Sequence, residues 1–176
     1  MTRPSVLFLC TGNAVRSVMA AAVLEAHGGP YQATSAGTLA VPGQPMGWRT
    51  RDALVALGLP VPPHRSRQAT PALLDQATLV VAMAREHVAW VRQWCPGAAE
   101  RTATLPWLAS RLPLGPAPLT ERLGALHLST ARLSEQDEVA EPDPEDPASY
   151  QTLAARIRTL VDELARRLTP APPTGG

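Results

Sequence analysis

A cysteine and an arginine stand six residues apart near the start of the chain, as Cys10 and Arg16 in the segment CTGNAVRS at positions 10–17. A cysteine thiolate is a strong nucleophile, and an arginine guanidinium presents a planar fork that matches two oxygens of a phosphate group. The spacing alone is weak evidence, because an isolated cysteine is more often a buried apolar residue. The pair nevertheless indicates attack on phosphorus, with the arginine stabilising the charge.

The elements around this segment strengthen that interpretation. Residues 5–9 form a short apolar run typical of a buried parallel strand, and residues 17–26 are strongly helix-forming. Ligands of open α/β sheets bind at the carboxyl ends of strands, and a helix N-terminus offers unpaired N–H groups. Gly12 and Asn13 tolerate positive φ, so the connecting loop can turn its N–H groups around an anion. The same field favours the thiolate form of Cys10.

The segment therefore predicts an oxyanion site after the first strand. Arg16 would clamp the anion, and Ser17 would either donate to the Cys10 sulfur or cap the following helix. The predicted phosphate-binding residues are Thr11, Gly12, Asn13, Ala14, Val15, Arg16 and Ser17.

Strand and helix patterns alternate along the rest of the chain, which predicts an α/β fold with a parallel sheet. Residues 1–168 are expected to form a single domain, and the Pro/Gly-rich residues 169–176 a disordered tail. The four tryptophans, Trp48, Trp90, Trp94 and Trp107, are expected to lie on helices and to pack in the core. The other predicted strands cover residues 31–35, 78–83 and 101–105, and the other predicted helices cover residues 46–57, 85–95, 120–128 and 150–168.

Composition narrows the function classes. The formal net charge of +1 gives no electrostatic reason to expect nucleic-acid binding, and no apolar segment approaches membrane-spanning length. The two cysteines, Cys10 and Cys95, are too few for a disulfide framework. We therefore expect a cytoplasmic protein that binds neither nucleic acid nor a membrane.

The segment at positions 10–17 resembles the phosphate-binding loop of the low-molecular-weight protein tyrosine phosphatases, whose pattern is cysteine, five residues, arginine, then serine or threonine. Two later segments also resemble the family, SAGT at positions 35–38 and HRSRQ at positions 64–68. The resemblance covers roughly residues 5–105 and 139–168. It implies a four-stranded parallel sheet flanked by helices, with the phosphate-binding loop after the first strand. It also implies that Ser35 and His64 support Asn13 by hydrogen bonding.

The general acid of the family is the aspartate of an Asp-Pro pair on a late loop. Here residues 139–147 read VAEPDPEDP. Asp143 matches by residue type, whereas Glu141 matches by register, with Tyr150 at the expected start of the last helix. Asp146 is a third candidate. The sequence leaves the choice between Glu141 and Asp143 open.

Aromatic residues that flank the family's site have no counterpart at the equivalent positions here. Residues 39–41 read LAV, and Glu145 and Asp146 follow the Asp-Pro pair. A phosphotyrosine ring would lose its usual stacking partners there. The resemblance therefore implies only a weak preference for phosphotyrosine over other phosphomonoesters.

The function predicted from these residues is hydrolysis of phosphomonoesters through a cysteinyl-phosphate, with no metal and no organic cofactor. The substrate would be a phosphorylated protein, including phosphotyrosine, or a small phosphomonoester. Two alternatives stay open. The first is an arsenate reductase that uses an external thiol, because Cys95 alone cannot supply an internal disulfide relay. The second is a phosphate- or phosphoprotein-binding module with little catalysis.

Overall fold

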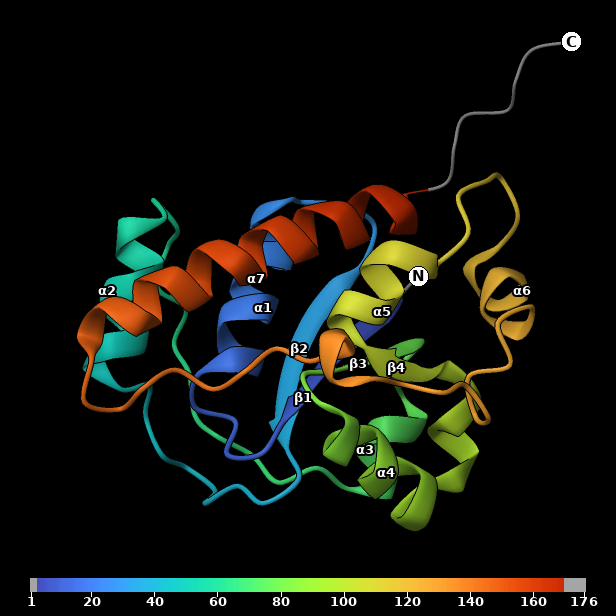
Figure 1. The fold of residues 1–176 in the computed structure, drawn as a ribbon, viewed down its shortest axis with the longest axis horizontal. Coiled ribbons are helices and arrows are strands. Elements are labelled where there is room, and N and C mark those ends of the chain that lie inside the picture. Colours follow the sequence, from blue (N-terminus) through green and yellow to red (C-terminus); the bar gives the residue numbers. More distant parts are fainter. Residues whose placement is uncertain (1–2, 170–176) are drawn as a thin grey trace, which may run out of the picture.

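The computed structural model describes residues 3–169, which form a four-stranded sheet with helices on both faces (Figure 1). All strand pairs are parallel, and the strand order is β2-β1-β3-β4. The predicted parallel α/β architecture is confirmed. The strands are β1 (Ser5–Cys10), β2 (Gln32–Gly37), β3 (Leu79–Ala82) and β4 (Thr102–Thr104).

Two helical layers enclose the sheet. Helices α1, α5 and α7 cover one face, with α2 beside α1 and α7, and α3 and α4 cover the other face (Figure 1). No helix within residues 3–169 is long and apolar enough to cross a membrane. The helices are α1 (Arg16–Ala26), α2 (Trp48–Ala56), α3 (Pro71–Asp75), α4 (Arg85–Trp94), α5 (Leu105–Arg111), α6 (Leu119–Gly124) and α7 (Pro147–Leu168), and short 3-10 turns span Pro96–Arg101 and Glu135–Asp137.

Strand β1 is buried on both faces, which explains its unbroken apolar sequence. Val6, Phe8 and Cys10 belong to the core cluster under α1, α5 and α7, whereas Leu7 and Leu9 belong to the cluster under α3 and α4. Alternate residues of a strand point to opposite faces, so this pattern fixes the register of β1. Cys10 is the last residue of the strand and faces the α1 layer.

The structure departs from the sequence expectations mainly at the helices. Helix α6 ends at Gly124, whereas the sequence predicted a helix over residues 120–128. Helix α7 begins at Pro147 rather than at residue 150, because the Asp146 side chain accepts a hydrogen bond from the Ala148 N–H and proline suits the first helical position. Helices α3 and α5 were not predicted, since each is short and contains proline. From residue 170 onward the expected disordered tail lies outside the described residues.

The prediction that the tryptophans pack in the core is wrong for two of the four. Trp107 is buried, and Trp90 packs against the smaller core cluster. Trp48 and Trp94, however, are 52% and 62% exposed. Each stands at an end of its helix, where the side chain can lie outside the layer that the helix forms.

Candidate active site

Residues 10–17, the phosphate loop, connect β1 directly to α1. Cys10 is only 3% exposed, and its Sγ lies 3.0 Å from the Ser17 Oγ. Ser17 does not cap the helix, since α1 begins at Arg16 after Val15 and has no side-chain cap. Of the two alternatives for Ser17, the structure therefore favours the contact with the sulfur.

Asn13 holds the turn of the phosphate loop. Its φ of 53° is the left-handed conformation that the sequence suggested, whereas Gly12 does not adopt a positive φ. The Asn13 Nδ2 donates to the Ser35 Oγ at 2.9 Å and to the Ser17 Oγ at 3.1 Å, and its Oδ1 accepts from the Arg67 N–H at 3.0 Å. These contacts satisfy a buried amide and hold the loop in a conformation that few residues adopt.

His64 reaches the same turn from the segment before α3. Its Nε2 lies 2.8 Å from the Asn13 carbonyl oxygen, so this nitrogen must be the donor. Burial lowers the pKa of His64 below its ordinary value, which favours a neutral imidazole with the proton on Nε2. The structure thus brings both Ser35 and His64 against Asn13.

Arg16 is 5% exposed and binds the late loop, residues 139–147, through both ends of its guanidinium group. Its Nη1 donates to the Val139 carbonyl at 3.1 Å, and its Nη2 donates to the Glu141 Oε1 at 2.5 Å. A pocket of about 200 Å³, here called the phosphate pocket, lies between the two loops. Its lining residues are Cys10, Gly12, Ala14, Val15, Arg16, Glu141, Pro142, Pro144 and Tyr150.

The three candidate carboxylates are placed differently. Glu141 lines the phosphate pocket, and its side chain is 67% exposed. Asp143 does not line the pocket, because its Oδ1 accepts from the Glu145 N–H at 2.9 Å within its own turn. Asp146 serves as the cap of α7. The geometry therefore favours Glu141, which matches the family by register, over Asp143, which matches it by residue type.

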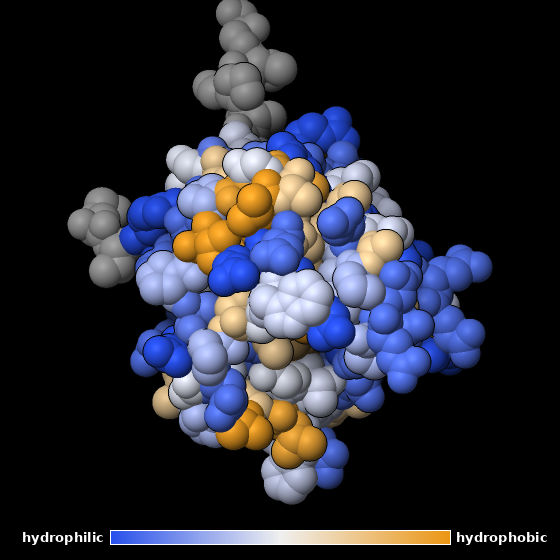
Figure 2. All heavy atoms as spheres, turned by 90° about the vertical axis from the view of Figure 1, so that its left-hand side faces the viewer, coloured by the Kyte–Doolittle hydropathy of each residue, from blue (hydrophilic) through white to orange (hydrophobic). Residues whose placement is uncertain are grey.

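One aromatic residue at the pocket was missed from the sequence. Tyr150 lines the phosphate pocket, and the Arg49 Cζ lies 6.0 Å from its ring centroid and 4.6 Å from that of the exposed Trp48. The side of the molecule that carries α2 shows hydrophobic residues in separate groups among polar ones (Figure 2). The family pattern placed Tyr150 only at a helix start, and nothing in the sequence paired it with α2.

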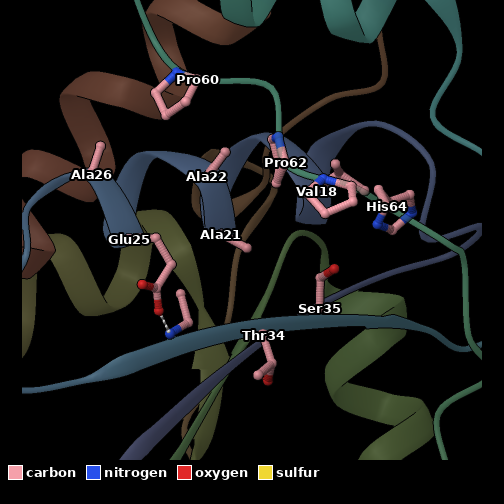
Figure 3. Close-up of a pocket in the computed structure, with 12 residues that line it drawn as sticks. Val18, Ala21, Ala22, Glu25, Ala26, Thr34, Ser35, Pro60, Pro62 and His64 are labelled. Carbon is pink, nitrogen blue, oxygen red and sulfur yellow. Dashed lines mark hydrogen bonds between the residues drawn. The ribbon is translucent and has the colours of Figure 1, made fainter.

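A separate cavity of about 310 Å³ lies between α1, β2 and the segment 60–64 (Figure 3). Its walls are largely apolar, with alanines from α1 and three prolines from the segment. Glu25 crosses its edge and accepts the Ala33 N–H at 2.5 Å. Ser35 and His64 border both this cavity and the turn at Asn13, so the cavity lies behind the phosphate loop.

His87 is a second histidine at the phosphate loop, and sequence reasoning missed it. Its Nδ1 accepts from the Ala84 N–H at 3.0 Å, so its Nε2 carries the proton and donates to the Thr11 Oγ1 at 2.9 Å. Burial, and then the charge of Arg16, lower the pKa of His87 to about 4. A lone histidine in an amphipathic helix gave no signal of this contact.

The depressed pKa of His87 predicts a loss of stability in mild acid. The unfolded chain takes up this proton near pH 6.5 and the folded chain only near pH 4, so stability falls as the pH falls through this interval. The full effect is about 3 kcal/mol. Urea unfolding measured from pH 7 to 4 should show it, and His87→Gln, which retains a donor but does not titrate, should have a flatter profile. Identical profiles would contradict this expectation.

Cys95 is free and buried at the end of α4, and burial raises the pKa of its thiol. It belongs to the core cluster under α3 and α4, whereas Cys10 belongs to the cluster on the opposite face of the sheet. The two sulfurs therefore have no direct route to a shared disulfide.

Comparison with known proteins agrees with this geometry. The family model of the low molecular weight phosphotyrosine protein phosphatases matches residues 5–109. A protein-arginine-phosphatase of Geobacillus stearothermophilus is 29% identical over 164 residues, which cover 93% of this chain and 95% of the relative.

Solved structures similar to this one support the same family assignment. The YwlE arginine phosphatase from Geobacillus stearothermophilus has a TM-score of 0.75 at 30% identity and covers 94% of this chain and 92% of its own. A low molecular weight protein tyrosine phosphatase from T. tengcongensis has a TM-score of 0.73 at 26% identity and covers 92% and 97%. This chain belongs to the low molecular weight phosphotyrosine protein phosphatase family and is a cysteine-dependent phosphatase.

Proposed function

We propose that Cys10 is the nucleophile, Arg16 the phosphate clamp and Glu141 the proton donor of a phosphatase that acts on phosphorylated side chains of proteins. The observation that carries this proposal is the phosphate pocket, which joins these three side chains. Both cysteines are free, which suits the reducing conditions of the cytoplasm, and we place the enzyme there.

The reaction has two steps. The Cys10 thiolate attacks phosphorus while the bond to the leaving atom breaks, and the Glu141 carboxylic acid gives its proton to that atom. The Glu141 carboxylate then takes a proton from water, whose oxygen attacks phosphorus and releases the Cys10 thiolate and inorganic phosphate. Arg16 and the loop N–H groups stabilise the added negative charge in both transition states.

Ser17 and Asn13 support these steps without contacting the leaving group. A hydroxyl 3.0 Å from the Cys10 Sγ can donate to the thiolate when it leaves phosphorus in the second step. The contacts of Asn13 hold the loop so that phosphate binding does not have to order it first.

Glu141 begins this cycle bound to Arg16, at the position where a phosphate oxygen would bind. An incoming phosphate dianion takes over the arginine fork and displaces the Glu141 carboxyl from it. Substrate binding thus frees Glu141 to act on the leaving atom.

The preferred substrate in this proposal is phosphoarginine. The sequence match at 29% identity and the solved structure at 30% identity, both of nearly full length and both from Geobacillus stearothermophilus, are named arginine phosphatase. Guanidine is a strongly basic leaving group that departs only after protonation, and Glu141 can supply that proton. Phosphotyrosine is the second candidate, because Tyr150 lines the pocket and could stack on its ring.

Two peptides of one sequence, with either phosphoarginine or phosphotyrosine at the same position, test this choice. We expect kcat/KM to be at least about tenfold higher for phosphoarginine. Its leaving group is basic, so its hydrolysis gains more than that of phosphotyrosine from protonation by a carboxylic acid. Phosphate release is the readout, with Cys10→Ser as the blank. A reversed order, together with a loss of about 3–10-fold on phosphotyrosine alone in Tyr150→Leu, would favour phosphotyrosine.

The same enzyme and peptides also test the two alternatives left open by the sequence, an arsenate reductase and a phosphate-binding module. Turnover without added thiol, and no arsenate-dependent consumption of a thiol, argues against a reductase. Multiple turnovers per enzyme molecule argue against a binding module.

A further inference from the structure

The guanidinium group of Arg49, at the start of α2, lies over two aromatic rings. Its Cζ is 4.6 Å from the ring centroid of Trp48 and 6.0 Å from that of Tyr150. Contacts of this kind hold an arginine in place through its faces and leave the N–H groups at its edge free to bind an acceptor.

Arg49 has no acidic partner among residues 3–169. Its Nε is buried and has no acceptor, and no hydrogen bond or ion pair to the other described residues joins its guanidinium group. Arg51, two residues along the same helix, shows the contrast, because its Nε binds the Asp52 Oδ1 at 3.3 Å. An oriented and unpaired guanidinium is a ready receptor for an anion.

Two contacts place Arg49 at the rim of the phosphate pocket. Tyr150, whose ring faces Arg49, also lines the pocket with Cys10 and Arg16. The next residue of α2, Thr50, donates from its Oγ1 to the Ala14 carbonyl of the phosphate loop at 3.2 Å. The start of α2 is thus fixed to the loop that binds the phosphate.

We propose that Arg49 binds the carboxylate of an acidic residue next to the phosphorylated residue of the substrate. The planar fork matches a carboxylate through two parallel hydrogen bonds, and the two rings hold it before the substrate arrives. Arg49 would therefore select phosphorylated sites in acidic sequence. This inference rests on the proposal that the substrate is a phosphorylated protein.

A pair of phosphopeptides tests the proposal, one with glutamate and the other with glutamine on both sides of the phosphorylated residue. The wild-type enzyme should have a kcat/KM about 3–10-fold higher for the glutamate peptide, mainly through KM. Arg49→Gln should remove this preference and leave the rate on the glutamine peptide unchanged. Arg49→Lys should keep part of it, because it retains the charge without the fork.

Arg51→Gln is the matched control, since it removes the same charge from the same helix, and it should keep the wild-type preference. Equal wild-type rates on both peptides, or a preference that survives in Arg49→Gln, would overturn the role of Arg49. Turnover of a small aryl phosphate, measured for every variant, separates the two proposals. If the wild-type enzyme hydrolyses that ester but neither peptide, the protein substrate is wrong and the role of Arg49 is wrong with it.

Discussion

Cys10→Ser is expected to lower kcat by about 10⁴-fold or more, because a serine hydroxyl is a far weaker nucleophile than a thiolate. The site offers no side chain that would activate a hydroxyl, since the nearest partner of Cys10 is the hydroxyl of Ser17 at 3.0 Å. Steady-state and single-turnover rates on an aryl phosphate measure the loss. Residual turnover within about tenfold of wild type would show that Cys10 does not attack phosphorus.

Phosphate binding distinguishes the nucleophile from the clamp. Cys10→Ser should bind inorganic phosphate at least as tightly as the wild-type enzyme, because Arg16 and the loop N–H groups stay in place and the serine hydroxyl carries no charge that repels the dianion. Arg16→Lys should lose both phosphate binding and turnover, the latter by about 10²–10³-fold, since an ammonium cannot replace the fork. Calorimetric titration with phosphate provides the comparison. An Arg16→Lys variant that binds phosphate normally would rule out the clamp.

Glu141→Gln is expected to lower kcat by about 10²–10⁴-fold on substrates with basic leaving groups and much less on nitrophenyl phosphate. The amide has no acidic proton to give, whereas nitrophenolate leaves without one. A series of aryl and alkyl phosphates should therefore show rates that fall more steeply with leaving-group pKa in this variant than in wild type. The same variant should bind phosphate more tightly, because the carboxylate no longer competes for Arg16.

Asp143→Asn is the matched control for Glu141→Gln. The Asp143 side chain accepts a hydrogen bond within its own turn, and asparagine can do the same, so this variant should follow wild type across the series. Glu141→Asp, which shortens the reach by one methylene, should recover part of the rate. If the rates of Asp143→Asn, rather than those of Glu141→Gln, fell steeply with leaving-group pKa, the late loop would have to rearrange when substrate binds.

The two histidines that contact the phosphate loop show how much a residue pattern can predict. His64 was found because its short segment resembles one of the family, although proline residues before it suggested only a surface turn. His87 was not predicted, because its contact with the phosphate loop is made to Thr11, 76 positions away in the chain. Contacts of this kind depend on how α4 packs under the sheet and leave no local pattern.

The phosphate loop is the part that the sequence by itself determined. Strand, loop and helix are contiguous here, so the residue types that favour each one also fix the order Cys10, Asn13, Arg16 at the end of β1. The parallel sheet followed in the same way, from alternating apolar runs and helices.

Only the tertiary structure decided which side chains complete the site. Glu141 and Arg16 stand 125 positions apart, and the choice of Glu141 over Asp143 depends on how the late loop lies over the phosphate loop. The contact of Arg49 with the Tyr150 ring likewise requires α2 to pack beside α7. Local propensity sets the path of neighbouring residues, whereas contacts across the fold arise from the packing of whole helices and loops, which the sequence encodes only collectively.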